Sequence, residues 1–156
     1  MADYGAFHEG GCHCGAVRYR FGGEPVASVI CNCPSCRGVS GAASVAFIMV
    51  PEATYALQSG VPAVYESSAG VRREHCAVCG TALTFRADYI EGMVDITAAS
   101  LHDPEAFPPT AHINDRHAIG WSRSQDGLPR FPEFPPQARG ATSNLVIPAK
   151  AGIHVG

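Results

Sequence analysis

Seven cysteines fall into three tight groups along the 156 residues of this chain. The groups are Cys12-His13-Cys14, Cys31-Asn32-Cys33-Pro34-Ser35-Cys36 and Cys76-Ala77-Val78-Cys79. Cysteines that serve only as small apolar side chains would be scattered, and an odd number of cysteines cannot all pair in disulfides. Close spacing of this kind is typical of metal sites, and it indicates zinc bound by thiolates.

The first and third groups together predict a closed, structural zinc site. In Cys76-x-x-Cys79 the turn directs both sulfurs at one point, and the following Gly80 permits a positive φ. Cys12 and Cys14 can do the same on a tighter bend, so that four thiolates complete a tetrahedron. Such a site would join the first strand to a distant hairpin. A redox role for Cys76 and Cys79 is the alternative, but no βαβ pattern surrounds them.

The middle group predicts a second, open metal site. Cys31, Cys33 and Cys36 place three thiolates in one short run and leave a fourth coordination position free, as catalytic zinc sites do. The alternative is a second structural site that a histidine completes. The candidates are His13, His75 and His112. The first two adjoin expected ligands, so we expect their side chains to point away from the metal.

Short runs bounded by glycine, proline and polar residues predict a mostly β protein, since no stretch has a sustained helical period. The predicted strands are Val17–Phe21, Ser28–Cys31, Ala43–Val50, Tyr55–Gln58, Ala63–Glu66, Arg72–His75, Ala82–Arg86 and Met93–Thr97. Leu101–Ala106 could form one helical turn capped by Asp103. The single tryptophan, Trp121, is expected in the core. Pro129–Pro136 is rich in proline and should run extended over the surface.

One domain is predicted over residues 10–132, and it is followed by an extended C-terminal tail over residues 133–156. We expect this tail to be disordered. Its last segment, Ser143–Gly156, resembles the translated product of a dispersed bacterial repeat, and we attach no function to it.

Charge and hydropathy exclude several classes of partner. The net charge is −3 and no basic run is present, which argues against a nucleic-acid surface. Met1–Gly11 lacks the basic and apolar regions of a signal peptide. The longest apolar stretch, Ala42–Val50, is too short to span a membrane. We therefore expect a cytoplasmic protein that binds neither nucleic acid nor a membrane.

Several stretches resemble the glutathione-dependent formaldehyde-activating enzyme family, which includes the centromere protein V type. They are Gly11–Tyr19, Cys31–Arg37 with Ser40-Gly41, Cys76–Thr81, Leu101–Pro104, His112-Ile113, Trp121 and Leu128–Phe131. The resemblance covers roughly residues 10–132, with all three cysteine motifs in order. One departure is His75, where the family often has an aromatic residue.

The resemblance implies a β-tent fold of antiparallel sheets organised around a structural zinc. Carried over motif by motif, Cys12, Cys14, Cys76 and Cys79 would hold the structural zinc, and Cys31, Cys33 and Cys36 would hold the catalytic zinc. The founding activity of the family is the condensation of formaldehyde with glutathione to S-hydroxymethylglutathione, a carbon–sulfur lyase reaction. The implied partners are therefore a small thiol, such as glutathione, and a small aldehyde.

The chemistry of three thiolates agrees with that expectation. Three thiolates give a zinc site an excess negative charge, so the metal lowers the pKa of bound water less effectively. The same soft site suits an incoming thiol, whose pKa the metal lowers. Arg37 directly follows the site and could contact a substrate anion, or it could support the loop through backbone carbonyls. Asn32 and Ser35 could donate hydrogen bonds to a thiolate or an oxyanion, or could serve the turn.

A second hypothesis is a non-catalytic zinc module used for binding or scaffolding, as the centromere protein V branch suggests. Such a module would be expected to carry basic tails for its partners, and the chain has no lysine- or arginine-rich run. The open Cys31–Cys36 group favours the enzyme.

Overall fold

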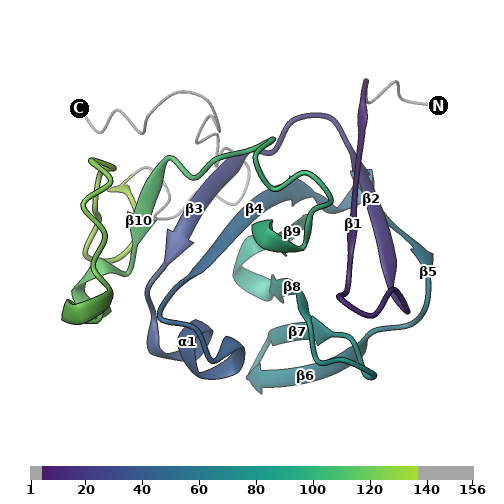
Figure 1. Ribbon diagram of the computed structural model, residues 1–156, viewed down its shortest axis with the longest axis horizontal. Coiled ribbons are helices and arrows are strands. Elements are labelled where there is room, and N and C mark those ends of the chain that lie inside the picture. The colour runs from purple at the N-terminus through teal and green to yellow at the C-terminus, as the bar shows by residue number, and fades with distance from the viewer. Residues whose placement is uncertain (1–4, 137–156) are drawn as a thin grey trace.

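The computed structural model describes residues 5–136 and consists of two β-sheets and one α-helix (Figure 1). The smaller sheet has the order β1-β2-β5, formed by β1 (Phe7–Gly11), β2 (Arg18–Gly22) and β5 (Tyr55–Ser59). The larger sheet has the order β10-β3-β4-β9-β8-β7-β6. Its strands are β3 (Ala27–Cys31), β4 (Val45–Pro51), β6 (Ala63–Ser68), β7 (Val71–His75), β8 (Ala82–Ala87), β9 (Met93–Thr97) and β10 (Ala111–Ile113). The helix is α1 (Pro34–Ser40).

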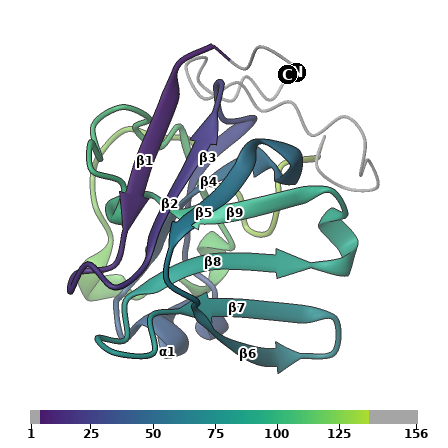
Figure 2. The ribbon, with the colours of Figure 1, turned by 90° about the vertical axis from the view of Figure 1, so that its right-hand side faces the viewer.

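The small sheet lies across one face of the large sheet, as Figure 2 shows. Tyr19 and Phe21 of β2 are fully buried between the sheets, where they join Ile48 of β4 and Ile96 of β9 in the main core. Each large side chain buried in this way contributes about 1.5–3 kcal/mol. Side chains alternate between the two faces along a strand. The residues next to Ile48 in β4 and next to Ile96 in β9 therefore face the other side of the large sheet, where α1 lies.

The structure confirms the prediction of a mostly β protein, and each predicted strand is present with its ends within two residues of the predicted ones. The small sheet is antiparallel throughout, whereas the large sheet is mixed, because β10 pairs with β3 in parallel. The prediction missed β1, β10 and α1. The sequence of β1, FHEGG, is polar and glycine-rich, and β10 has only three residues, so neither carries a readable alternation.

Two local predictions were wrong. Leu101–Ala106 forms a turn instead of a helix: the Asp103 carbonyl accepts a hydrogen bond from Ala106 N at 3.3 Å, and its carboxylate accepts one from Glu105 N at 3.2 Å. Trp121 is 83% exposed, because it lies in a short 3-10 turn, Gly120–Ser122, that has no buried residue.

Part of the segment Pro129–Pro136 packs against β10, so the prediction that it runs over the surface was incomplete. Phe131 N donates to the His112 carbonyl at 2.9 Å, and His112 N donates to the Pro129 carbonyl at 2.8 Å. Pro135 is fully buried. Residues 137–156, with most of the predicted tail and its repeat-like end, lie outside the described residues, and the domain boundary stays a prediction.

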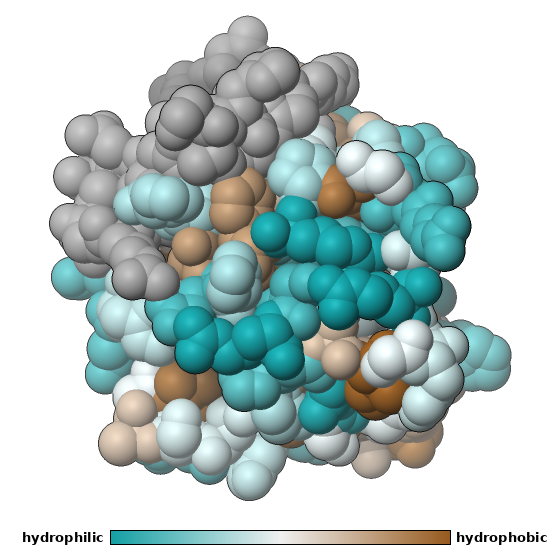
Figure 3. All heavy atoms as spheres, turned by 90° about the vertical axis from the view of Figure 1, so that its left-hand side faces the viewer, coloured by the Kyte–Doolittle hydropathy of each residue, from teal (hydrophilic) through white to brown (hydrophobic). Residues whose placement is uncertain are grey.

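The loops between β10 and residue 131 are held together by charged pairs. The buried carboxylate of Asp115 accepts hydrogen bonds from Arg123 and, at 2.8 Å, from Arg130. His112 Nε2 lies 2.8 Å from a carboxylate oxygen of Asp126. Hydrophilic side chains fill the middle of the face of the molecule shown in Figure 3. The ion pairs of Asp115 and Asp126 hold these loops in place.

Within residues 5–136, no helix has both the length and the apolar character needed to cross a membrane.

Candidate metal centres

Two tight bends bring the first and third cysteine groups together. Cys12 N donates to the Val17 carbonyl at 3.0 Å, which closes the β1–β2 connection around Gly15, whose φ is +86°. Cys76 N donates to the Thr81 carbonyl at 2.9 Å and closes the β7–β8 loop in the same way. The two bends come from different sheets, and their four sulfurs lie within 4.8 Å of one another.

The spacing of these four sulfurs fits zinc. A zinc–sulfur bond of about 2.3 Å in a tetrahedron places neighbouring sulfurs about 3.8 Å apart. The Sγ atoms of Cys12 and Cys14 are 3.6 Å apart, and those of Cys14 and Cys76 are 3.8 Å apart. Hydrogen bonds, chiefly from the Thr81 hydroxyl, lower the pKa of Cys79 to about 5, which favours the thiolate that a metal requires.

The three-cysteine group is built on the start of α1. Cys33 is the N-cap residue, and its sulfur accepts a hydrogen bond from Cys36 N at 3.3 Å. Pro34 occupies the first turn, where a missing N–H costs nothing, and Gly41 ends the helix with a φ of +66°. Cys31 ends β3, so the strand end and the helix start hold the three sulfurs within 4.8 Å of one another.

Each of the three sulfurs accepts one further hydrogen bond from the protein. Asn114 Nδ2 donates to Cys31 Sγ at 3.4 Å, Cys36 N donates to Cys33 Sγ, and Arg73 Nη1 donates to Cys36 Sγ at 3.6 Å. Asn114 holds its position with a φ of +51°, directly before the buried Asp115. Such contacts orient thiolates for a metal. Neither Asn114 nor Arg73 belongs to a motif that predicts a metal site.

The three thiols share their protons unequally. Hydrogen bonds from the thiols of Cys31 and Cys36 lower the pKa of Cys33 far below its ordinary value. The same bond to Cys33 raises the pKa of Cys31. One thiolate is thus stabilised at the expense of its neighbours, which is the arrangement that a metal ion relieves by replacing the shared protons.

The residues next to the cysteines take structural roles. Arg37 donates a hydrogen bond to the His117 carbonyl, which is the loop-supporting alternative, and its contact with a substrate anion stays a prediction. The Asn32 amide donates to the Ile113 carbonyl at 3.2 Å instead of to a thiolate. Ser35 lines a pocket beside α1.

No histidine of residues 5–136 joins either group of sulfurs. The three-cysteine group therefore has no histidine ligand in this part of the chain, although His112 had been a candidate. The His112 ring instead lies between Asp126 and the side chain of Asn32.

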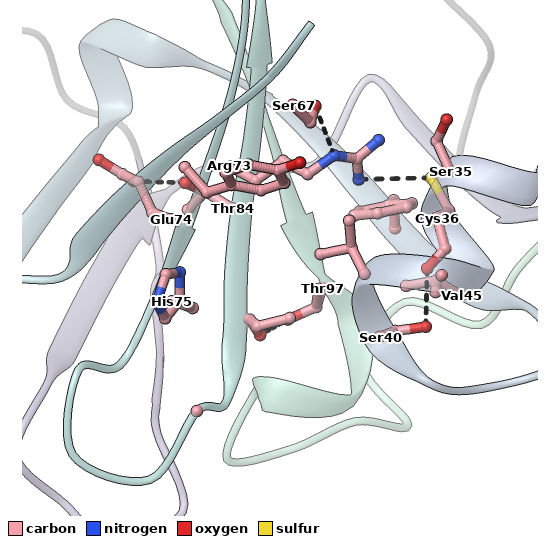
Figure 4. Close-up of a pocket in the computed structure, with 16 residues that line it drawn as sticks. Ser35, Cys36, Ser40, Val45, Ser67, Arg73, Glu74, His75, Thr84 and Thr97 are labelled. Carbon is pink, nitrogen blue, oxygen red and sulfur yellow. Dashed lines mark hydrogen bonds between the residues drawn. The ribbon is translucent and has the colours of Figure 1, made fainter.

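A pocket of about 550 Å³ lies between α1 and the strands β4, β6, β7 and β8. Figure 4 shows Ser35, Cys36 and Ser40 on the helix side and Glu74, His75 and Thr84 on the strand side, with the Arg73 guanidinium between Ser67 and Cys36. Val39, Val45 and Phe47 supply apolar lining. The pocket thus joins the three-cysteine group at Cys36 to the edge of the four-cysteine group at Gly80.

Burial shifts the pKa of one carboxyl group on β9. Asp95 of β9 lies opposite Phe85 of β8, and desolvation raises the pKa of Asp95 to about 7. Burial, together with the charges of Asp95 and of the Cys36 and Cys31 sulfurs, raises the pKa of Tyr89. A carboxyl group with such a pKa can both accept and return a proton under physiological conditions.

The fold and the two cysteine groups define a mostly β protein with one closed and one open site of metal-ligand geometry. The family model for the glutathione-dependent formaldehyde-activating enzyme matches residues 7–116, and the chain belongs to that family. A crystal structure of a Rhodobacter sphaeroides protein has the same fold, with a TM-score of 0.51 and 18% sequence identity, covering 61% of this chain and 88% of that chain. A search of the curated proteins finds no match.

The two groups should differ in how firmly they hold metal. We expect the purified protein to bind up to two zinc ions and to lose the ion at Cys31–Cys36 first during a chelator titration, because a closed four-thiolate site has no position for a competing ligand. Metal analysis at each chelator concentration measures this. Simultaneous loss of two ions with equal affinity would contradict the division into closed and open sites.

Proposed function

We propose that the protein is a zinc-dependent carbon–sulfur lyase that forms and cleaves thiol–aldehyde adducts, with S-hydroxymethylglutathione synthesis as the reference reaction. The observation that carries this proposal is the group of Cys31, Cys33 and Cys36. Its three sulfurs have metal-ligand spacing and no fourth protein ligand in residues 5–136, and Cys36 lines a pocket large enough for a small peptide thiol. Membership of the formaldehyde-activating family supports the same reaction.

Zinc is the metal that the donor set fits best, since all seven donors are thiol sulfurs. Cys31, Cys33 and Cys36 would hold the catalytic ion, and Cys12, Cys14, Cys76 and Cys79 would hold the structural one. The catalytic ion would supply a soft Lewis acid that lowers the pKa of a substrate thiol.

The protein's own residues would bind and orient the two reactants. In the reaction the thiol sulfur bonds to the carbonyl carbon, the C=O π pair moves to oxygen, and that oxygen gains the proton that the thiol has lost. Asp95 is our candidate for exchanging this proton, since a pKa of about 7 would allow both steps, although its carboxyl is not part of the pocket lining. Val39, Val45 and Phe47 would exclude water from one side of the pocket, and Ser35, which also lines it, could meet polar groups of a peptide thiol. Arg37 lies outside the pocket lining and would reach a substrate anion only by leaving the His117 carbonyl.

We place the protein in the cytoplasm, where glutathione is abundant. All seven cysteines are free of disulfides, which suits a reducing compartment.

Exchange spectroscopy tests the proposed reaction. ¹³C-formaldehyde and glutathione equilibrate with their adduct without a catalyst, and we expect the zinc-loaded protein to raise this exchange rate at least tenfold. Cys33→Ser should return the rate to the uncatalysed value, because it removes one of only three ligands. An unchanged rate with protein that holds zinc in both sites would contradict the lyase and favour the non-catalytic module.

A further inference from the structure

We propose that Arg73 is a positioning residue of the three-cysteine site, and that its buried guanidinium compensates the charge of the thiolates and thereby raises the affinity of the site for metal. The proposal rests on the proposed function only in that Cys31, Cys33 and Cys36 hold a metal ion. It adds a residue from the middle of β7, far in sequence from that group.

Three contacts hold the guanidinium group of Arg73 in place. Its Nη1 donates to Cys36 Sγ at 3.6 Å, its Nε donates to the Ser67 hydroxyl at 3.0 Å, and the guanidinium carbon lies 4.8 Å from the centre of the Phe85 ring (Figure 4). The residue is 8% exposed. A planar guanidinium held by a hydroxyl and stacked on an aromatic ring keeps its orientation towards the sulfur.

The neighbouring arginines have carboxylate partners, whereas Arg73 does not. Arg72 lies 3.5 Å from Asp88, and Arg86 pairs with Glu52. Among the described residues no aspartate or glutamate forms an ion pair with Arg73. A buried cation without a counter-ion is costly. The Cys36 sulfur, as a thiolate, is the counter-ion that the structure provides.

The charges explain what this contact does. Three thiolates around a divalent ion leave one excess negative charge, and the guanidinium cancels it. The site is then close to neutral before a fourth, anionic ligand enters, so that ligand meets less repulsion. Without Arg73 the same three thiolates would repel one another and the incoming ligand in a partly desolvated place. Removing a residue that hydrogen-bonds to a metal ligand, without being a ligand itself, typically lowers metal affinity about 10–100-fold.

Zinc competition with a chromophoric chelator tests the proposal on the purified 156-residue protein. We expect R73M, which keeps the side-chain volume but not the charge, to bind zinc at the open site at least tenfold more weakly, with no change at the four-cysteine site. R73K keeps the charge and should recover most of the affinity. R72M is the matched control, because Arg72 is exposed on the opposite face of the same strand, and it should bind as the wild type does.

Cobalt substitution adds a readout that a purely structural role would not change. Removing a positive charge from beside a thiolate raises the energy of its donor electrons, so the sulfur-to-cobalt charge-transfer band of R73M should move to longer wavelength. If R73M fails to fold, R73Q and R73K decide: the proposal expects the neutral glutamine to lose far more affinity than the lysine. Equal affinities for these two variants, or wild-type affinity and spectrum in R73M, would overturn it. Failure of the lyase reaction alone would leave these measurements unaffected.

Discussion

Replacing Cys79 with serine is expected to unfold the protein or to cause it to aggregate, whereas replacing Cys36 is expected to leave it folded. The four-cysteine site ties the β1–β2 bend of the small sheet to the β7–β8 loop of the large sheet, and Cys12 and Cys76 are part of the main core. Structural zinc sites contribute about 10–16 kcal/mol of apparent binding free energy, as much as the whole stability of a typical domain.

The exposure of Cys79 makes this a clean test. Its side chain lies outside the buried core, so serine removes a metal ligand without creating a cavity. Circular dichroism melts should show a fall of tens of degrees, or no cooperative transition, for Cys79→Ser. Cys36→Ser should keep its cooperative transition and lose metal only at the open site. If Cys36→Ser is the more destabilised of the two, the structural and catalytic roles are reversed.

The sequence was enough to predict the strands and the gathering of the cysteines into two groups, because both depend on local patterns. Alternation within β2 and the continuous apolar run of β4 are visible in a few residues, and the cysteine spacings indicate which sulfurs can share a site. The helix α1 was missed although it carries a signal: Pro34 is well suited to the first helical turn, and Gly41 stands just after the last turn. The run Cys31–Cys36 was interpreted only as a source of metal ligands, and its helix-start signal was not used.

The residues around the open site could not be predicted, because the topology brings them from distant parts of the chain. Asn114 contacts Cys31 because β10 pairs with β3 in parallel. No short sequence pattern predicts that pairing. Arg73 reaches Cys36 from β7, and neighbouring Arg72 differs from it in nothing but the face of the strand. Asp95 is a single carboxylate in an apolar strand, and only the folded surroundings raise its pKa.

A thiol added to the cobalt-substituted protein is expected to change its visible spectrum strongly, and this change should depend on the open site alone. Three thiolates disfavour hydroxide as a fourth ligand but tolerate another sulfur, as stable four-cysteine sites demonstrate. Glutathione should therefore strengthen the charge-transfer absorption in proportion to the occupied open site. S-methylglutathione, which has the same carboxylates but no free thiol, should leave the spectrum unchanged.

The pH dependence of this change follows from the proton that the thiol must lose. Binding releases a proton, so the apparent affinity should rise about tenfold per pH unit from pH 6 upward, and should level off once glutathione ionises in solution. Cys33→Ser should abolish the response, while Cys79 and its three partners stay occupied by the second ion. A wild-type spectrum that no thiol alters, with cobalt present at Cys31, Cys33 and Cys36, would remove the physical basis of the lyase, since the open position would then have no affinity for the group that the reaction must activate.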